Sequence, residues 1–427
     1  MPPATVQRST RTGPKGRAVG TPDRVERVDL LVIGAGAAGL SLACELAGSR
    51  LRDRRILVLD DGSQSLPDRT WAYWTACRRT VHRAAAHSFG RLSVNTLGRA
   101  RVLQPERYRY EVVTGAGLLA LTRSLADGAP GLELRSGHVE AVSQRPDGVT
   151  VTVDGSPIRA SLVFDSVGVP GGRSSADSRE FTGGRESTGA PRLWMTFREC
   201  RIRTDRPVLA PDTATLFDFR TPQGADARFV HVLPGSAREA LVTLTGYSGR
   251  PVPPPAADLA GYLERVLQAP GAQILHEGAG NIPLRPARPP RRVGRVVPIG
   301  ANAGLLKAST GYAFERIRQH SEDLVNALCR GRPPDPAPGS NARHRLLDEV
   351  FLQAVQHDPA VLERTFAALV DGNPADRLLA FLDESTSTGQ ELRLIGSMPK
   401  APFVRAAAAV GVRALRRGPS GLRSAAR

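Results

Sequence analysis

A glycine-rich segment near the amino terminus limits what this chain can fold into. The apolar run Leu30–Ile33 leads into residues 34–39 (GAGAAG), and an apolar helical pattern follows at once. This order predicts a buried strand, a tight turn and a helix whose positive N-terminus faces the turn. Glycines there permit the turn, the approach of a pyrophosphate and the close packing of helix on strand. We therefore predict a dinucleotide-binding unit with the cofactor-binding residues Gly34, Gly36, Ala38 and Gly39.

A second strand supports the same prediction. Residues 55–60 (RILVLD) are typical of a buried strand that ends in an acid, Asp60, about twenty residues after Gly39. A carboxylate at this point binds a ribose hydroxyl of the cofactor. The alternative is an ordinary βαβ unit whose acid is only solvated. FAD and NAD share these features, so they do not identify the cofactor.

A glycine-rich segment late in the chain provides further candidate ligands of the cofactor. Residues 293–303 (VGRVVPIGANA) predict a buried strand that ends in small residues, and the sequence after it predicts a long helix to residue 330. We expect this helix to open at residues 309–312 and to direct backbone N–H groups towards the cofactor. The added cofactor-binding candidates are Gly300, Ser309, Thr310, Gly311 and Tyr312.

The remaining patterns predict an α/β fold. A buried strand at 162–166 is expected beside the first strand, and alternating strands between 193 and 245 predict an antiparallel sheet. The fold class is a Rossmann-type FAD/NAD(P)-binding domain with an inserted antiparallel β-sheet substrate domain and a helical C-terminal part. The predicted divisions are 1–26 (disordered extension), 27–190 and 286–330 (the two parts of the dinucleotide-binding domain), 191–285 (substrate domain) and 331–427 (helical region).

The composition of the chain limits which cell compartment and which binding partners we expect. The 427 residues carry a net charge of +17, nearly all of it from arginine. A solvated basic surface is the first interpretation and an anionic membrane surface the second. Aromatic residues are few, so we predict no nucleic-acid partner. The four cysteines are scattered without metal spacing, which predicts reduced thiols, a cytoplasmic protein and no metal site. No apolar run reaches 18 residues, so no spanning helix is expected.

Two segments leave alternatives open. Trp71, Tyr73 and Trp74 lie close together in a predicted loop, where they either fill the core or line an apolar substrate cavity. Residues 401–417 predict a helix rich in alanine and arginine. It either lies on a membrane surface or packs as a terminal helix.

Several short motifs occur together along the chain. They are GAGAAG at 34–39, DRTW at 68–71 with Trp74, FDS at 164–166, FDFR at 217–220, FVHVLP at 229–234, NIPL at 281–284, Gly300 with STGYAF at 309–314, and RLLAFL at 377–382. Their order and spacing over roughly residues 28–405 resemble the lycopene cyclase family of FAD-dependent carotenoid enzymes.

The resemblance implies a function. Such cyclases require reduced FAD but undergo no net redox change, and a carboxylic acid protonates the end of an acyclic polyene before a ring closes. It implies FAD as the cofactor, NAD(P)H as a candidate reductant and a hydrophobic small-molecule substrate. The substrate would be drawn from a membrane, so peripheral contact with the inner face of the membrane is a further expectation.

The sequence departs from the family at its acids. The family carries a glutamate in the strand after the FVxxLP segment, and here Thr243 occupies that position. Three further acid positions read Gly246, Thr75 and Gly278. A threonine or a glycine cannot donate a proton as a carboxylic acid does, so proton delivery has been rebuilt or removed.

Other acids in the chain are candidates for the catalytic acid. Asp218 in the FDFR segment comes first, with the alternative that it only pairs with Arg220. Asp68 has a similar alternative beside Arg69, and Glu277 is next to the lost acid at Gly278. Glu315 is expected to be an exposed helix acid. We place Trp71, Tyr73, Trp74, Phe217, His231 and Thr243 in the substrate pocket.

Two other classes of function compete with a cyclase. The first is an FAD-dependent oxidoreductase, either a monooxygenase or a reductase, on a hydrophobic natural product. Aromatic hydroxylases place an aspartate after the late glycine, whereas this segment reads GAN at 300–302. The second is a member that keeps the flavin fold without catalysis.

Overall fold

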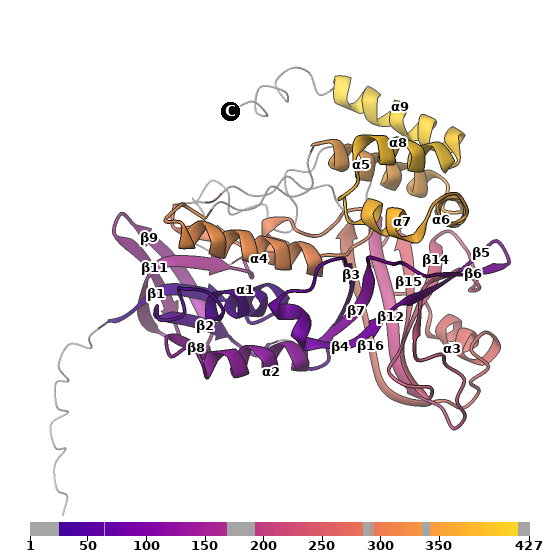
Figure 1. Ribbon diagram of the computed structural model, residues 1–427. Helices are drawn as coiled ribbons and strands as arrows, with labels where there is room; N and C mark the ends of the chain where they lie inside the picture. Colours follow the sequence, from indigo (N-terminus) through magenta and orange to yellow (C-terminus); the bar gives the residue numbers. More distant parts are fainter. Residues whose placement is uncertain are drawn as a thin grey trace, which may run out of the picture.

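Three β-sheets organise the chain, and C-terminal helices lie across one of them (Figure 1). The computed structural model describes residues 25–63, 65–168, 193–284, 292, 294–334 and 342–416. The predicted extension at 1–26 therefore lies almost wholly outside the described residues, and the first strand already begins at Glu26.

The first sheet is built around the strand that precedes the glycine turn. Its order is β8-β2-β1-β11-β10-β9, and β17 also pairs with β11. Strands β2 and β11 both run parallel to β1, and Leu31 pairs with Val163, which confirms the predicted return of 162–166 beside the first strand. The bounds are β1 (Glu26–Ile33), β2 (Ile56–Asp60), β8 (Leu132–Ser136), β9 (Val139–Arg145), β10 (Gly148–Val153), β11 (Ser156–Asp165) and β17 (Val296–Pro298).

Both faces of this first sheet are covered. On one face Val32 and Val58 pack against the helical side chains of Leu42 and Leu324. On the other face Leu31 packs with residues of the β9–β10 hairpin. Strands buried on both faces need continuous apolar runs, which is why 30–33 shows no alternation. The helices are α1 (Ala37–Ala47), α2 (Gly115–Ala126) and α4 (Phe314–Cys329).

The second sheet has the order β16-β12-β15-β14-β13-β5-β6. Its strands alternate between two faces, one packed on α3 and the other on the C-terminal helices. Two of its strands come from residues 91–103, and β5 runs parallel to β13, so the sheet is antiparallel except at that pair. The bounds are β5 (Arg91–Thr96), β6 (Arg99–Leu103), β12 (Leu193–Arg203), β13 (Thr213–Asp218), β14 (Ala227–Pro234), β15 (Glu239–Ser248), α3 (Ala256–Arg265) and β16 (Gln273–Leu284).

A third, three-stranded sheet stands between the other two in Figure 1. Its central strand is β7 (Arg109–Thr114), flanked by β3 (Thr70–Thr75) and β4 (Ala85–Phe89). The aromatic segment that we expected in a loop is therefore strand β3. The expectation was wrong because β3 gains its hydrogen bonds from β7, which is distant in sequence.

The C-terminal part is helical, as predicted. Its helices are α5 (Ala342–His357), α6 (Val361–Gly372), α7 (Ala375–Leu382), α8 (Thr388–Ser397) and α9 (Lys400–Arg416). Their apolar side chains join one cluster with the second sheet, in which Phe366 packs on Phe217 with ring centroids 4.0 Å apart. Among the described residues no helix combines the length and the apolar character that crossing a bilayer demands.

Candidate functional site

The turn between β1 and α1 has the geometry of an anion cradle. Gly34 has a φ of +92°, which favours glycine, and a Cβ at Gly39 would lie 1.9 Å from the carbonyl oxygen of Gly34. At Gly36 a Cβ would meet no described atom within 4 Å, so the turn is open there. Within the described residues α1 has neither a capping side chain nor an acid in its first turn. Its N–H groups and positive end therefore suit a pyrophosphate.

Asp60 lies beside this turn at the end of β2. Its Oδ2 accepts the N–H of Ala35 at 2.6 Å, and its Oδ1 accepts the N–H of Gly62 at 2.9 Å. Each carboxylate oxygen can accept a further hydrogen bond, so a ribose hydroxyl fits here. The carboxylate thus holds the turn in place and retains the capacity to bind a ribose.

The late glycine lies beside the cradle. Gly300 begins the 3₁₀ turn η2 (Gly300–Ala303) with a φ of +65°, and a Cβ there would lie 2.8 Å from the Cβ of Ala38. The side-chain amide of Asn302 donates to the carbonyl oxygen of Asp165 at 3.1 Å. The carboxyl ends of β1, β11 and β17 therefore meet at one edge, where parallel sheets bind ligands.

The loop after η2 differs from our expectation. The helix α4 begins at Phe314, not at residues 309–312. The N–H groups of Thr310 and Gly311 both donate to the carbonyl oxygen of Lys307, at 3.2 and 2.8 Å. The N–H of Tyr312 bonds the hydroxyl of Thr310 at 3.4 Å. These backbone donors are used inside the turn, so a role for residues 309–312 in cofactor binding stays a prediction.

This loop instead joins the first sheet to the second. The hydroxyl of Tyr247 on β15 donates to the carbonyl oxygen of Ser309 at 2.7 Å. Gly311 has a φ of +72°, and a Cβ there would lie 2.3 Å from the methyl carbon of Met195 on β12. Glycine is thus required where the loop touches the second sheet.

A buried ionic cluster fixes the loop to the C-terminal helices. The carboxylate of Glu384 lies 2.5 Å from Lys307 and 2.5 Å from Arg316, and His344 is 3.4 Å away. Burial raises the pKa of Glu384, but Lys307 and Arg316 lower it by more, so the carboxylate is ionised. Asp348 lies 3.4 Å from Lys307 and balances the cluster further.

The predicted aromatic residues gather where α4 begins. Phe314 stacks with Tyr73 at 4.7 Å and with Trp71 at 5.7 Å between ring centroids, and Trp74 lies 4.6 Å from Tyr312. A cavity of about 20 Å³, room for one water molecule, lies among them. Asp383 also lines this cavity, and burial with the nearby Glu315 raises its pKa to about 7. No motif in the sequence marks Asp383, because it follows α7 and reaches this cavity only through the fold.

The other predicted pocket residues lie on the second sheet. The ring of Phe217 is 5.7 Å from that of His231, and it belongs to the same apolar cluster as Trp74. Burial lowers the pKa of His231 to about 4, so this imidazole is neutral at pH 7. Thr243 pairs with His231 across the strands β14 and β15.

Asp218, the first catalytic candidate, is fully engaged in the structure. Its carboxylate accepts Arg220 at 2.7 Å, Tyr262 at 2.8 Å and Asn95 at 3.2 Å. Tyr262 belongs to α3, so these bonds tie the second sheet to that helix. This geometry favours the structural alternative for Asp218, because its hydrogen bonds hold β5, β13 and α3 together.

The structure separates the other candidate acids. Asp68 is exposed and its carboxylate accepts the hydroxyl of Ser65. Glu277 is exposed and pairs with Cys200, whose side chain packs towards α3. Glu315 is buried rather than exposed, and Arg318 donates to it at 2.9 Å. Burial raises the pKa of Glu315, but His82 and Arg318 lower it by more.

The four positions without their acids do not form one group. Thr75 is buried at the end of β3, and Gly246 pairs with Thr196 on β12. Thr243 and Gly278, however, lie on either side of one residue, Glu199. No motif in the sequence marks Glu199, because only the pairing of β12 with β15 and β16 brings it there.

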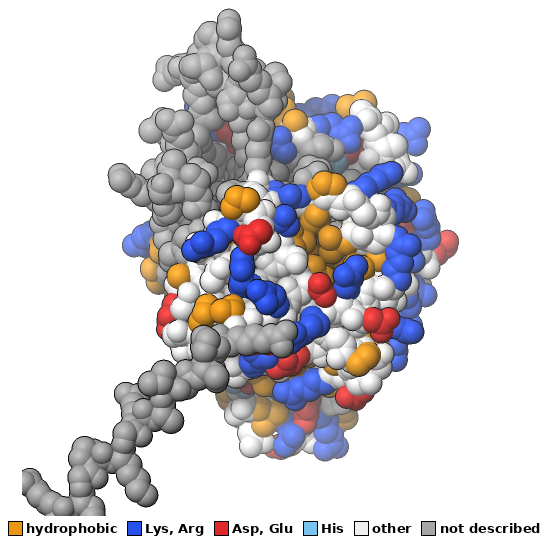
Figure 2. Space-filling model, turned by 90° about the vertical axis from the view of Figure 1, so that its left-hand side faces the viewer, with side chains coloured by type: hydrophobic (Ala, Val, Ile, Leu, Met, Phe, Trp, Pro, Cys, Tyr) orange, Lys and Arg blue, Asp and Glu red, His pale blue; other side chains and the backbone are white. Residues whose placement is uncertain are grey.

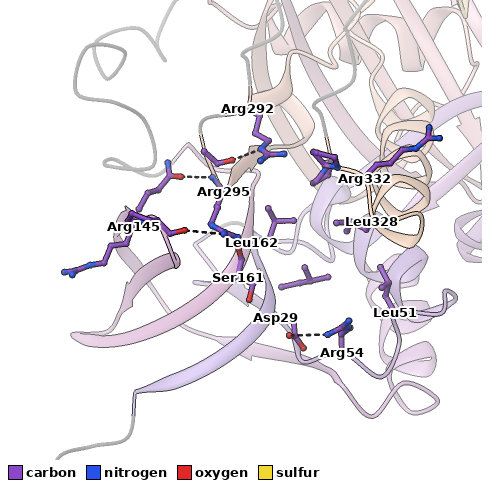
Figure 3. A pocket seen from close by; sticks show the side chains of 17 residues that line it. Asp29, Leu51, Arg54, Arg145, Ser161, Leu162, Arg292, Arg295, Leu328 and Arg332 are labelled. Carbon is purple, nitrogen blue, oxygen red and sulfur yellow. Dashed lines mark hydrogen bonds and ion pairs between the residues drawn. The ribbon is translucent and has the colours of Figure 1, made fainter.

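A much larger cleft lies at the other end of β1. It measures about 940 Å³, and Figure 3 shows Arg54, Arg292, Arg295 and Arg332 around it. Arg295 donates to the carbonyl oxygen of Ser161 at 3.2 Å, so part of this charge supports the backbone. Figure 2 shows Lys and Arg side chains spread over the described part of the face it draws. The cleft lies where β1 begins, far from the glycine turn.

Comparison with solved structures finds proteins that have a similar fold. A geranylgeranyl bacteriochlorophyll reductase-like protein from Thermoplasma acidophilum matches with a TM-score of 0.55 and 14% identity, covering 90% of this chain and 100% of that one. A flavoprotein/dehydrogenase from Cytophaga hutchinsonii matches with a TM-score of 0.53 and 14% identity, covering 89% and 98%. A p-nitrophenol 4-monooxygenase from Pseudomonas putida gives 0.51 and 16%, covering 87% and 98%. At these identities the likeness shows the fold alone.

The protein is thus of the class that joins a Rossmann-type dinucleotide-binding sheet to a second β-sheet, a fold that a flavoprotein of known structure shares. The model of the family described as lycopene cyclase protein matches residues 29–408, and the chain belongs to that family. The comparison with curated proteins gave no match.

Proposed function

We propose that the protein binds FAD and closes a ring on an apolar polyene or terpenoid without net redox change. The family match over residues 29–408 carries this proposal. The cradle supports it, because the open turn at Gly36 and the carboxylate of Asp60 fit the pyrophosphate and ribose of FAD. NAD(P)H is the proposed source of electrons for the flavin.

The reaction needs an acid and a place for positive charge. A carboxylic acid gives its proton to an end double bond, the next double bond closes the ring, and a ring carbon then loses a proton. Atoms and electrons balance, so the product is an isomer of the substrate. Bound in its reduced form, FAD supplies negative charge that stabilises the cation. The faces of Trp74 and Tyr312 also attract a cation at short range.

Anaerobic turnover of lycopene tests this function. Purified protein with FAD reduced by dithionite would be mixed with lycopene in liposomes, and products separated by chromatography with mass detection. We expect γ- or β-carotene with the mass of lycopene, in the absence of oxygen and without stoichiometric NADPH oxidation. The controls are the same mixture without FAD and the same mixture with oxidised FAD.

The oxidoreductase alternative gives a different result in the same assay. A monooxygenase or reductase would consume NADPH in step with a change of product mass, and a monooxygenase would also consume oxygen. Either outcome contradicts the cyclase proposal. A yellow, FAD-containing protein that converts no lycopene would point to a different polyene.

A further inference from the structure

A row of side chains crosses one face of the second sheet. Glu199 on β12 pairs with Thr243 on β15 and with Gly278 on β16. Thr243 pairs in turn with His231 on β14. Directly paired residues of antiparallel strands direct their side chains to the same face. His231, Thr243 and Glu199 therefore stand next to one another, and Gly278 leaves the end of the row bare.

The carboxyl group of Glu199 occupies the space in front of both neighbours. The hydroxyl of Thr243 lies 3.5 Å from its Oε2, and a Cβ added at Gly278 would lie 3.1 Å from its Oε1. A carboxyl group carried by any of these three positions would reach nearly the same point. Here Glu199 carries it, and the other two positions are small or neutral.

The surroundings of Glu199 raise the pKa of its carboxyl group. The side chain is half-buried, and burial raises the pKa of its carboxyl group; His276, Thr243, Arg69 and Arg201 lower it by less. In the part of the chain that the structure describes, Glu199 forms no ion pair, and the Thr243 hydroxyl is its one side-chain hydrogen bond. Asp218, by contrast, is paired with Arg220.

The row borders the apolar side of the sheet. The imidazole of His231 packs edge-on against Phe229 at 5.0 Å and lies 5.7 Å from Phe217. Both phenylalanines belong to the cluster that also holds Trp74. An apolar chain lying along this cluster would bring its end towards the carboxyl group of Glu199.

We propose that Glu199 is the acid that protonates the end of the polyene, an inference that rests on the cyclase function proposed above. The O–H bond of Glu199 breaks as a C–H bond forms at the end double bond. After ring closure a ring carbon returns a proton to the carboxylate, which restores the acid. No further reactant is needed.

Moving the carboxyl group tests the proposal. Glu199→Gln keeps the shape and removes the acid, and the double variant E199T/T243E carries the acid on the neighbouring strand. Glu264→Gln, on the exposed side of α3, is the matched control. FAD content and circular dichroism establish that each variant is folded. Cyclisation of lycopene with reduced FAD is then followed in a single turnover.

We expect E199Q to lose about 100-fold or more of the rate, the scale of general acid catalysis. E199T/T243E should recover to within about tenfold of the wild type, and E264Q should match it. A folded, FAD-containing E199Q with wild-type activity overturns the proposal. So does a double variant as inactive as E199Q.

An infrared titration separates failure of this proposal from failure of the cyclase function. If the wild type does not cyclise lycopene, the cyclase function fails on that substrate. The carboxylic acid band of Glu199 is then followed against pH in the wild type and in E199Q. A band that persists above the usual pKa of glutamate and disappears in E199Q supports the assignment. Its absence from the wild type overturns it, whatever the substrate.

Discussion

Two glycines of the turn between β1 and α1 differ in what a methyl group would meet. In Gly39→Ala the methyl carbon would clash with the carbonyl oxygen of Gly34, so we expect about 1–3 kcal/mol lower stability and weak flavin binding.

In Gly36→Ala the methyl group enters open space where the pyrophosphate is proposed. Thermal unfolding without flavin should then match the wild type, while FAD affinity falls at least about tenfold. Unchanged FAD affinity in G36A, measured by fluorescence titration, would contradict this placement.

The candidate acids show how far residue type and motif position alone can indicate a catalytic acid. Asp218 stood out in the sequence because it lies in a matched motif, yet its partners Asn95 and Tyr262 come from β5 and α3. Glu199 stood out in no way, because its neighbours Thr243 and Gly278 are set by strand register. The state of a carboxyl group depends on neighbours across the sheet, and sequence spacing does not contain them.

Among the elements, the end of α7 is held by an ion cluster where glycine is usual. Glu384 has a φ of +58°, and the N–H groups of Glu384 and Ser385 bond back to Phe381 and Ala380 as in a glycine-ended helix. In Glu384→Gln, the buried Lys307 and the partly buried Arg316 lose the carboxylate that they share. We expect about 3–5 kcal/mol lower stability at pH 7 in urea unfolding.

The same variant has a defined pH dependence. The pKa of Glu384 is lowered in the folded protein, so its stabilisation is present above the unfolded-state pKa and is lost as the pH falls through the folded value. The difference between wild type and E384Q should therefore be largest near neutral pH and shrink in acid. Glu264→Gln, at an exposed glutamate of α3 that forms no ion pair within the described residues, is the control. A difference that stays constant from pH 7 to well below 4.5, the ordinary pKa of glutamate, would contradict the ion-pair account.

Elements were predictable where the signal is local. The strand, glycine turn and helix at 30–47 follow from adjacent residues, and the structure confirms them. Strand β3 was missed because its hydrogen bonds come from β7, and the start of α4 was placed early because residues 309–312 form a turn closed on Lys307. Tertiary pairing decides both cases, and neither leaves a mark in the local pattern.

For the whole molecule, the two large sheets are joined at several points rather than by one linker. The loop at 304–313 touches Met195 and Tyr247 of the second sheet, and Lys307 in it pairs with Glu384 after α7. Strands β5 and β6 carry the early part of the chain into the second sheet. We infer that a cofactor bound at the first sheet and a substrate bound at the second sheet would meet at this junction. The ring centroids of Trp74 and Tyr312 lie 4.6 Å apart there.

The outer surface of the whole molecule bears on membrane contact. Helix α9 packs on α5 through Ala406 and Val410, so the terminal-helix interpretation holds for that side. Its outer side exposes 66% of Val404 and 83% of Leu415, in a chain with a net charge of +17. We propose that this side rests on the surface of an anionic membrane, because exposed apolar residues and basic charge together favour such contact.

Vesicle sedimentation tests this contact. We expect the wild type to pellet with vesicles containing phosphatidylglycerol and to be released by high salt, since the attraction between exposed charges is screened. Val404→Glu/Leu415→Glu removes the apolar contact without touching the packed side, so binding should fall several-fold while thermal unfolding stays unchanged. Leu392→Glu, at an exposed leucine on α8, is the matched control and should bind as the wild type does. If the double variant and the wild type sediment with the vesicles to the same extent, α9 is excluded as the contact, because the two proteins differ only at Val404 and Leu415.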